Sequence, residues 1–148
     1  MGEFMKHFTV AFLLLFSGLT VAQTQPFPNL GPVPTMQGIL LAAGDMSTSE
    51  VDSTPLDLLG WKDADLQAVF TGAPVGNLKL QTSDDQVPNG ALVANWSDYT
   101  NSSTSVSAAG NFSWHLTSAG YRWVRAVYLK TSGTGALNVT FTRKGTGN

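Results

Sequence analysis

Residues Tyr121–Lys130 read YRWVRAVYLK, and this stretch decides the fold class that the sequence predicts. Alternate residues of an extended strand face opposite sides. The alternation gives two sets: Tyr121, Trp123, Arg125, Val127 and Leu129 on one side, and Arg122, Val124, Ala126, Tyr128 and Lys130 on the other. No stretch of the domain shows a helical period beyond one turn, so this one is expected to be the longest strand of a β-protein.

Both flanks of this strand repeat the alternation. Downstream, the turn Thr131–Gly135 leads into Ala136–Arg143, and upstream Gly110 separates Ser103–Ala109 from Asn111–Leu116. We expect a returning strand after the turn and a hairpin around Gly110. The apolar residues on one face of each run are Leu137, Val139 and Phe141 downstream, and Phe112, Trp114 and Leu116 upstream.

The first half of the domain gives the same pattern. Ala64–Thr71 and Asn77–Thr82 alternate on either side of the turn cluster Gly72–Gly76, which predicts a hairpin. Gln37–Ala43 is a short apolar run typical of a buried strand, and Leu92–Trp96 predicts a further strand. The inward residues of the hairpin are Leu66, Ala68 and Phe70, then Leu78 and Leu80.

About eight short strands, separated by turn signals every 8–12 residues, predict an all-β fold. The architecture expected from them is an antiparallel β-sandwich, a jelly roll of about eight strands, and a closed barrel is the alternative. The domain is expected to span residues 36–148, and the sequence contains no internal repeat.

The N-terminus predicts an export signal. Lys6 and His7 precede the apolar run Phe8–Phe16, and small residues follow as far as Ala22. A basic start, a short apolar stretch and a small-residue cut site indicate a Sec-type signal peptide over residues 1–22. We therefore expect a secreted, cell-surface or periplasmic protein with no membrane contact after the leader is removed. Residues 1–4, which precede a second methionine, are interpreted as an expression remnant.

A proline-rich arm is expected between the leader and the domain. Residues 23–35 contain prolines at positions 26, 28, 32 and 34, which forbid a helix and favour an extended segment. This arm is either a spacer or a segment that packs on a neighbouring subunit.

The charges are few and unevenly distributed. Charged residues make up 12% of the chain, about half the usual share, and the net charge is −2, which argues against a nucleic-acid partner. Residues 23–98 carry nine acids and two bases, whereas residues 99–148 carry five bases and no acid. We expect strands of the two halves to neutralise each other, with Arg122 or Arg125 paired to an acid of the first half. Head-to-tail stacking of copies is the alternative.

The sequence predicts neither an enzyme nor a strong metal site. The only histidine after the leader is His115, and no Gly-x-Ser-x-Gly elbow accompanies it. The acid pairs Asp84 with Asp85 and Asp63 with Asp65 are weak candidates for calcium, because no EF-hand spacing is present. The chain has no cysteine, which excludes a thiolate nucleophile and disulfides. No cofactor is expected.

Aromatic residues near loops are the candidates for ligand binding. Sugars are commonly held by an aromatic face beside amide or acid hydrogen-bonding groups. Trp96, Asp98 and Tyr99 lie together in a polar segment, and Trp61 lies near a turn. Tyr128 is a further aromatic candidate, on the assumption that it lies on an outward face. The predicted partner is carbohydrate or another surface component.

The last 80 or so residues resemble a class of small phage-type virion and tail-associated β-sandwich proteins with a discoidin-like, galactose-binding-type jelly roll. The residues that carry the resemblance are Leu66–Gly76, Leu78–Gln81, Trp96–Asp98, Phe112–Trp114, Tyr121–Arg125 and Thr131–Gly135. The resemblance implies a sandwich that binds or assembles. With the leader, it predicts an exported, non-catalytic module that binds a surface ligand. The alternative is a self-assembling subunit of a fibre, surface layer or virion-like particle, and therefore a homo-oligomer.

Overall fold

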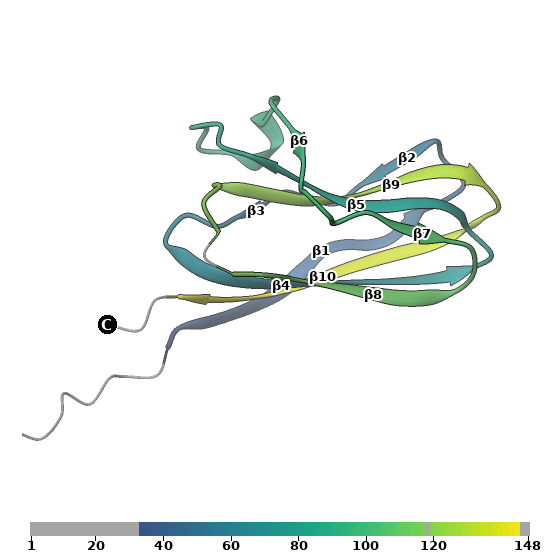
Figure 1. The fold of residues 1–148 in the computed structure, drawn as a ribbon, viewed down its shortest axis with the longest axis horizontal. Helices are drawn as coiled ribbons and strands as arrows, with labels where there is room; N and C mark the ends of the chain where they lie inside the picture. Colours follow the sequence, from purple (N-terminus) through teal and green to yellow (C-terminus); the bar gives the residue numbers. More distant parts are fainter. Residues whose placement is uncertain (1–32, 118, 146–148) are drawn as a thin grey trace, which may run out of the picture.

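The structure is a computed structural model that describes residues 33–117 and 119–145, and two antiparallel sheets face each other in it (Figure 1). We call them sheet A and sheet B. Sheet A has the order β1 (Thr35–Asp45), β10 (Gly135–Gly145), β4 (Trp61–Gly72) and β8 (Gly110–Leu116). Sheet B has the order β2 (Glu50–Asp52), β9 (Trp123–Ser132), β5 (Val75–Ser83) and β6 (Ser97–Asp98), with β3 (Leu56–Asp57) on β9 and β7 (Thr104–Val106) on β5.

The strand order is that of a jelly roll. β2 and β3 both pair with β9, and β6 and β7 both pair with β5, so each couple acts as one interrupted strand. Counted this way, sheet A has the order 1-8-3-6 and sheet B the order 2-7-4-5. The sandwich of about eight strands is thereby confirmed. The alternative of a closed barrel is wrong, because the described strands form two separate sheets.

The expected hairpins are wrong. β4 and β5 lie in opposite sheets, and so do β7 and β8, which begins at Gly110. The returning strand is confirmed as β10, but it too lies in the sheet opposite to β9. Each of these turns carries the chain from one layer to the other. Alternation fixes which residues face inward, but it does not reveal whether the next strand joins the same sheet or the facing one.

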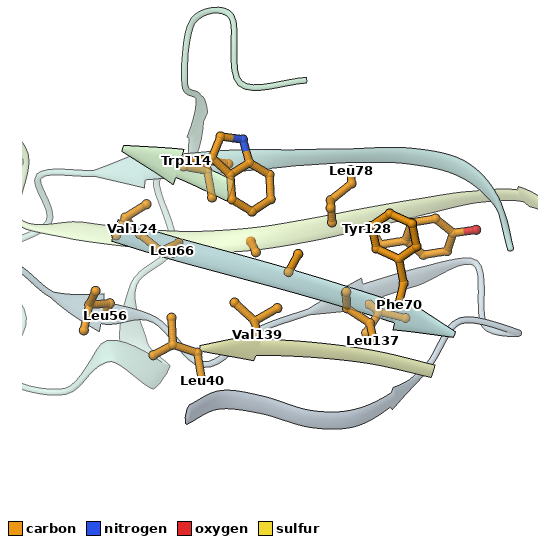
Figure 2. Close-up of a cluster of buried hydrophobic side chains, with 14 of the residues drawn as sticks. Leu40, Leu56, Leu66, Phe70, Leu78, Trp114, Val124, Tyr128, Leu137 and Val139 are labelled. Atoms are coloured by element: carbon orange, nitrogen blue, oxygen red, sulfur yellow. The ribbon is translucent and has the colours of Figure 1, made fainter. Parts of the chain in front are cut away.

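The predicted apolar stripes meet between the two sheets. The inward residues of β4, β5, β8 and β10 are buried or pack against the buried cluster. On β9 the inward set is that of the even positions. Figure 2 shows core side chains contributed by both layers, among them Leu66, Phe70, Leu78, Trp114, Val124, Tyr128, Leu137 and Val139.

The strand predicted over Gln37–Ala43 is confirmed, but the expectation that it is buried is wrong. β1 is the edge strand of sheet A, and of its residues only Leu40 is buried. The register with β10 shifts between Ile39 and Leu41 and again before Gly44, so bulges interrupt the alternation. Ile39 is 70% exposed as a result of its outward position.

A loop occupies the place of the strand that Leu92–Trp96 predicts. Residues 84–96 include one short 3-10 turn, Gly90–Leu92, which Asn89 caps through its side chain. The Asp85 carboxylate accepts hydrogen bonds from Ala94 N, Asn95 N and Asn95 Nδ2 at 2.8–3.0 Å. Side-chain bonds to the backbone therefore replace a strand ladder here.

This loop covers the outer face of sheet B at the start of β9. The Trp123 indole donates a hydrogen bond to Asp85 O at 2.9 Å and is 3% exposed. Figure 1 shows the loop standing away from the two layers beside β6.

Charges of the two halves pair within the molecule. Arg125 forms an ion pair with Asp52, and the Arg122 guanidinium lies 3.5 Å from Asp57. Both acids belong to the acidic first half, so the predicted neutralisation is confirmed. Burial raises the pKa of the Asp52 carboxyl, and the nearby Arg125 acts against this shift.

The leader at 1–22 and residues 23–32 of the arm lie outside the described residues, and β1 begins at Thr35. Within the part that the structure describes, no helix is long and apolar enough to cross a membrane.

Candidate functional site

The predicted ligand residue Trp96 packs against an arginine of sheet B. The Arg125 guanidinium lies 4.4 Å from the centroid of the Trp96 ring, and the indole N–H donates to Val93 O at 3.1 Å. Arg125 is itself held by Gln81 Oε1 at 2.7 and 3.0 Å. One face of Trp96 therefore anchors the loop 84–96 to the sheet, and the ring stays partly exposed.

The two neighbouring candidates point to different environments. Asp98 is exposed and accepts hydrogen bonds from Lys79 Nζ at 2.8 Å and Gln81 Nε2 at 2.9 Å, and these bonds lower the pKa of its carboxyl. Tyr99 packs against the core, and its ring meets Tyr121 edge to face at 5.6 Å. Asp98 and Trp96 thus share the outer side of sheet B, while Tyr99 turns inward.

Trp61 lies at the start of β4, in the other sheet. The Arg143 guanidinium lies 4.3 Å from its ring centroid and donates a hydrogen bond to Asp57 O. Burial lowers the pKa of Arg143. The structure therefore separates Trp61 from Trp96: each stacks on its own arginine, one in each sheet.

The placement of Tyr128 on an outward face is wrong. Its ring is fully buried in the core, and its hydroxyl donates to Val75 O at 3.0 Å. Burial raises the pKa of this hydroxyl. Val124 and Ala126, the neighbouring even positions of β9, face the core with it, whereas the odd positions face the loop and its surroundings.

The acid pairs have other partners in the chain. Asp85 holds the loop, and Asp84 accepts a hydrogen bond from Arg122 N at 3.2 Å. Asp63 stands opposite Lys144, and Asp65 is paired with His115. Over residues 33–117 and 119–145, no three His, Cys, Asp or Glu side chains gather in a way that could hold a metal ion.

A site that the sequence reasoning missed lies on the outer face of sheet A. A hollow of about 360 Å³ crosses β8, β4 and β10. Because directly opposite residues of paired strands share a face, the register brings the outward side chains of these strands into rows across the sheet. The polar side chains that line the hollow are Asp65, Gln67, Ser113, His115, Thr140 and Thr142.

A second hollow of about 350 Å³ continues the first one to the sheet edge. It shares Thr140, Phe141 and Thr142 with the first and adds Gln37, Gly38 and Ile39 of β1. We call the two together the trough. It crosses all four strands of sheet A, a span of about 14 Å at the usual strand spacing of about 4.8 Å.

A hydrogen-bonded pair of a histidine and an aspartate forms one end of the trough. His115 Nδ1 is hydrogen-bonded to Asp65 Oδ1, across the β8–β4 pair. The two side chains are 62% and 46% exposed, so both remain in contact with water. The Asp65 bond to Nδ1 orients the ring, and no hydrogen bond to Nε2 comes from the residues that the structure describes.

The trough gave one signal in the sequence. Its polar residues are the outward positions of the same runs whose inward positions form the core. The sequence does not show that four such short segments, near residues 38, 66, 114 and 141, lie side by side, because that depends on the strand order.

No protein-family model matches this chain, and no curated protein matches it. Among solved structures, the crystal structure of the SPBc2 prophage-derived protein YomS is similar, with a TM-score of 0.47. The two sequences are 16% identical, and the similarity covers 75% of this chain and 93% of YomS. The discoidin-like variety of jelly roll stays a prediction.

Proposed function

We propose that this chain is a non-catalytic binding module that holds a carbohydrate chain of a surface component in the trough of sheet A. The observation that carries the proposal is the row of outward polar side chains across four strands, in two hollows that share their middle residues. An elongated hollow on a rigid sheet suits an extended polymer better than a compact small molecule.

The chemistry of the lining favours sugar hydroxyls. Gln37 and Gln67 supply amide donors and acceptors, Asp65 supplies a carboxylate, and the Ser and Thr hydroxyls donate or accept as needed. Sugar hydroxyls both donate and accept, so they match this mixture. Ile39 adds an exposed apolar contact at the β1 end.

The exposure of His115 and Asp65 supports binding over catalysis. Transition-state stabilisation gains most of its strength in sites that exclude water. His115 and Asp65 are both more than 40% exposed, and no hydroxyl nucleophile is hydrogen-bonded to the His115 ring among the described contacts.

A glycan array followed by calorimetry tests the proposal. We expect the protein to bind a defined set of glycans, and Gln67→Ala to weaken that binding about threefold to tenfold, the cost of one or two hydrogen bonds. Trp96→Ala is the matched variant on the opposite sheet and is expected to leave the affinity unchanged.

Two results would contradict this placement. Loss of binding in Trp96→Ala with full binding in Gln67→Ala would move the site to the loop of sheet B. An array on which the wild-type protein binds no glycan would remove carbohydrate as the ligand.

The second candidate is a structural subunit of a fibre, surface layer or virion-like particle. The strand order favours it, because capsid subunits and lectins are both built on jelly rolls. This support is an analogy of fold, and the site-level evidence for the trough ranks above it.

A further inference from the structure

The outer edge of β1 carries main-chain groups that no strand of the described residues uses. β1 ends the strand order of sheet A and pairs only with β10. Gly145 N donates to Pro34 O at 2.9 Å, which fixes the hydrogen-bonded positions of this pair. Because bonded positions alternate in antiparallel pairs, Met36 and Gly38 bond to β10. Thr35, Gln37 and Ile39 therefore direct their N–H and C=O groups away from the sheet.

This free edge has a defined length. The free edge ends before Leu40, because Leu40 O accepts a hydrogen bond from Thr54 N at 2.9 Å. The bulges also begin there. The regular, unpaired edge is therefore the segment 33–39.

Between Thr35 and Ile39 the edge lacks the features that normally prevent strand addition, because Pro34 precedes this stretch and the bulges follow it. Natural edge strands carry charges, prolines or bulges to block pairing. From Thr35 to Gly44 the sequence has no charged residue and no proline. Its apolar side chains are exposed as well: Ile39 by 70%, Val33 by 47% and Met36 by 46%.

We infer that β1 pairs with β1 of a second copy of this chain, antiparallel and about a twofold axis at Gln37. The two four-stranded sheets then form one continuous sheet. The inference stands apart from the proposed function, since it requires no ligand.

The side chains of this segment complement themselves in that register. Gln37 faces Gln37 of the second copy, and Thr35 faces Ile39, which sets two β-branched residues opposite each other. Met36 faces Gly38, where the missing side chain leaves room. The three outward-directed positions form about six main-chain hydrogen bonds across the axis.

The proline-rich residues 23–32 of the same chain are less suited to pair with the β1 edge than a second copy of β1 is. Prolines at positions 26, 28 and 32 remove main-chain donors, and proline is confined to the margins of sheets. A second copy offers an uninterrupted donor and acceptor row, and the uncharged edge avoids like-charge repulsion about the axis.

Light scattering after size exclusion tests the inference. We expect the wild-type protein to have twice the mass of one chain. Gln37→Pro removes only a donor that points away from β10, so it should give a monomer with the same circular dichroism spectrum. Gln37→Ala keeps the main chain and should remain a dimer. A wild-type monomer at about 100 μM, where even weak pairs associate, or a dimeric Gln37→Pro would overturn the inference.

A cross-linking experiment decides the matter even if Gln37→Pro does not fold. The chain has no cysteine, so Gln37→Cys introduces a single thiol at the axis. A short bis-maleimide should convert this variant to a covalent dimer. Asn111→Cys, on the opposite edge strand β8, should stay monomeric on the denaturing gel. Equal cross-linking of both variants would contradict a β1 interface. Glycan binding by the wild-type protein separates this outcome from the proposed function: a monomer that binds glycans would contradict the β1 interface alone, and a dimer that binds none would contradict the proposed function alone.

Discussion

Asp85 shows how one side chain can define a loop. Its carboxylate accepts three hydrogen bonds from residues nine and ten positions further along, and its carbonyl accepts the Trp123 indole. The Asn95 amide and the backbone N–H groups lower the pKa of this carboxyl. The folded loop therefore favours the ionised form.

The sign of this shift predicts an acid-sensitive loop. A carboxyl whose pKa is lower in the folded state stabilises that state above its unfolded pKa of about 3.9. The contribution is lost as the pH falls through the lower, folded pKa. We expect the Trp96 and Trp123 indole N–H signals in NMR spectra to shift together below about pH 4, with the core signals unchanged.

Asp85→Ala should produce the same indole shifts at neutral pH. Asp84→Ala is the control, because Asp84 contacts Arg122 N and takes no part in the bonds to Ala94 and Asn95. Indole signals that respond equally to both substitutions would show that Asp85 does not hold the loop.

At the scale of elements, two turns pack against each other at one end of the sandwich. The turn between β4 and β5 and the turn between β9 and β10 are joined by a hydrogen bond from Ala73 N to Thr134 O at 2.9 Å. Gly72 and Gly133 both have positive φ, at 80° and 74°. A Cβ built on Gly133 would lie 2.0 Å from Ala73 O, a backbone atom that cannot easily move away.

Gly133→Ala should therefore be strongly destabilising. Left-handed backbone costs an alanine about 1–2 kcal/mol, and the clash adds to that. Gly60 also has a positive φ, of 79°, but a Cβ there would meet nothing within 4 Å. We expect Gly60→Ala to lower the free energy of unfolding by about 1 kcal/mol and Gly133→Ala by more than about 2 kcal/mol in urea titrations. Equal losses would mean that the packing of the turns adds nothing.

The turns mark the limit of what the sequence predicts about the fold. The inward stripes of β4, β5, β8 and β10 follow from alternation alone, and the structure confirms them. The pairing of the strands does not follow from alternation, because a glycine-containing segment such as 72–76 can either close a hairpin within one sheet or cross to the other sheet. The trough depends on the pairing, so its residues were not grouped. The sequence offers Asp85 only as a weak calcium candidate, and its role in the loop cannot be predicted because its partners lie nine and ten positions away.

At the scale of the whole molecule, the strand order separates neighbours in sequence. With β2 and β3 counted as one strand, and β6 and β7 as another, consecutive strands lie in opposite layers except where β6 and β7 follow β5 in sheet B. Sheet A is therefore built from segments near residues 40, 66, 113 and 140. Strands that are far apart in the sequence must come together, at a cost in chain entropy, before their contacts stabilise the sheet. This requirement slows folding.

We therefore predict that the denatured protein refolds in milliseconds to seconds, in the range of other sandwiches. Stopped-flow tryptophan fluorescence would measure the rate, with Trp114 and Trp123 as buried reporters. Refolding in microseconds would be incompatible with a strand order of this kind.

The hydrogen bond between Pro34 and Gly145 places the entry and exit of the domain next to each other, at the same end of sheet A (Figure 1). A unit of this kind can be spliced into a surface loop of a host protein without stretching that loop. It can also be circularly permuted by a short linker across the gap. Because its two ends are adjacent, the domain is suited to insertion into a larger protein.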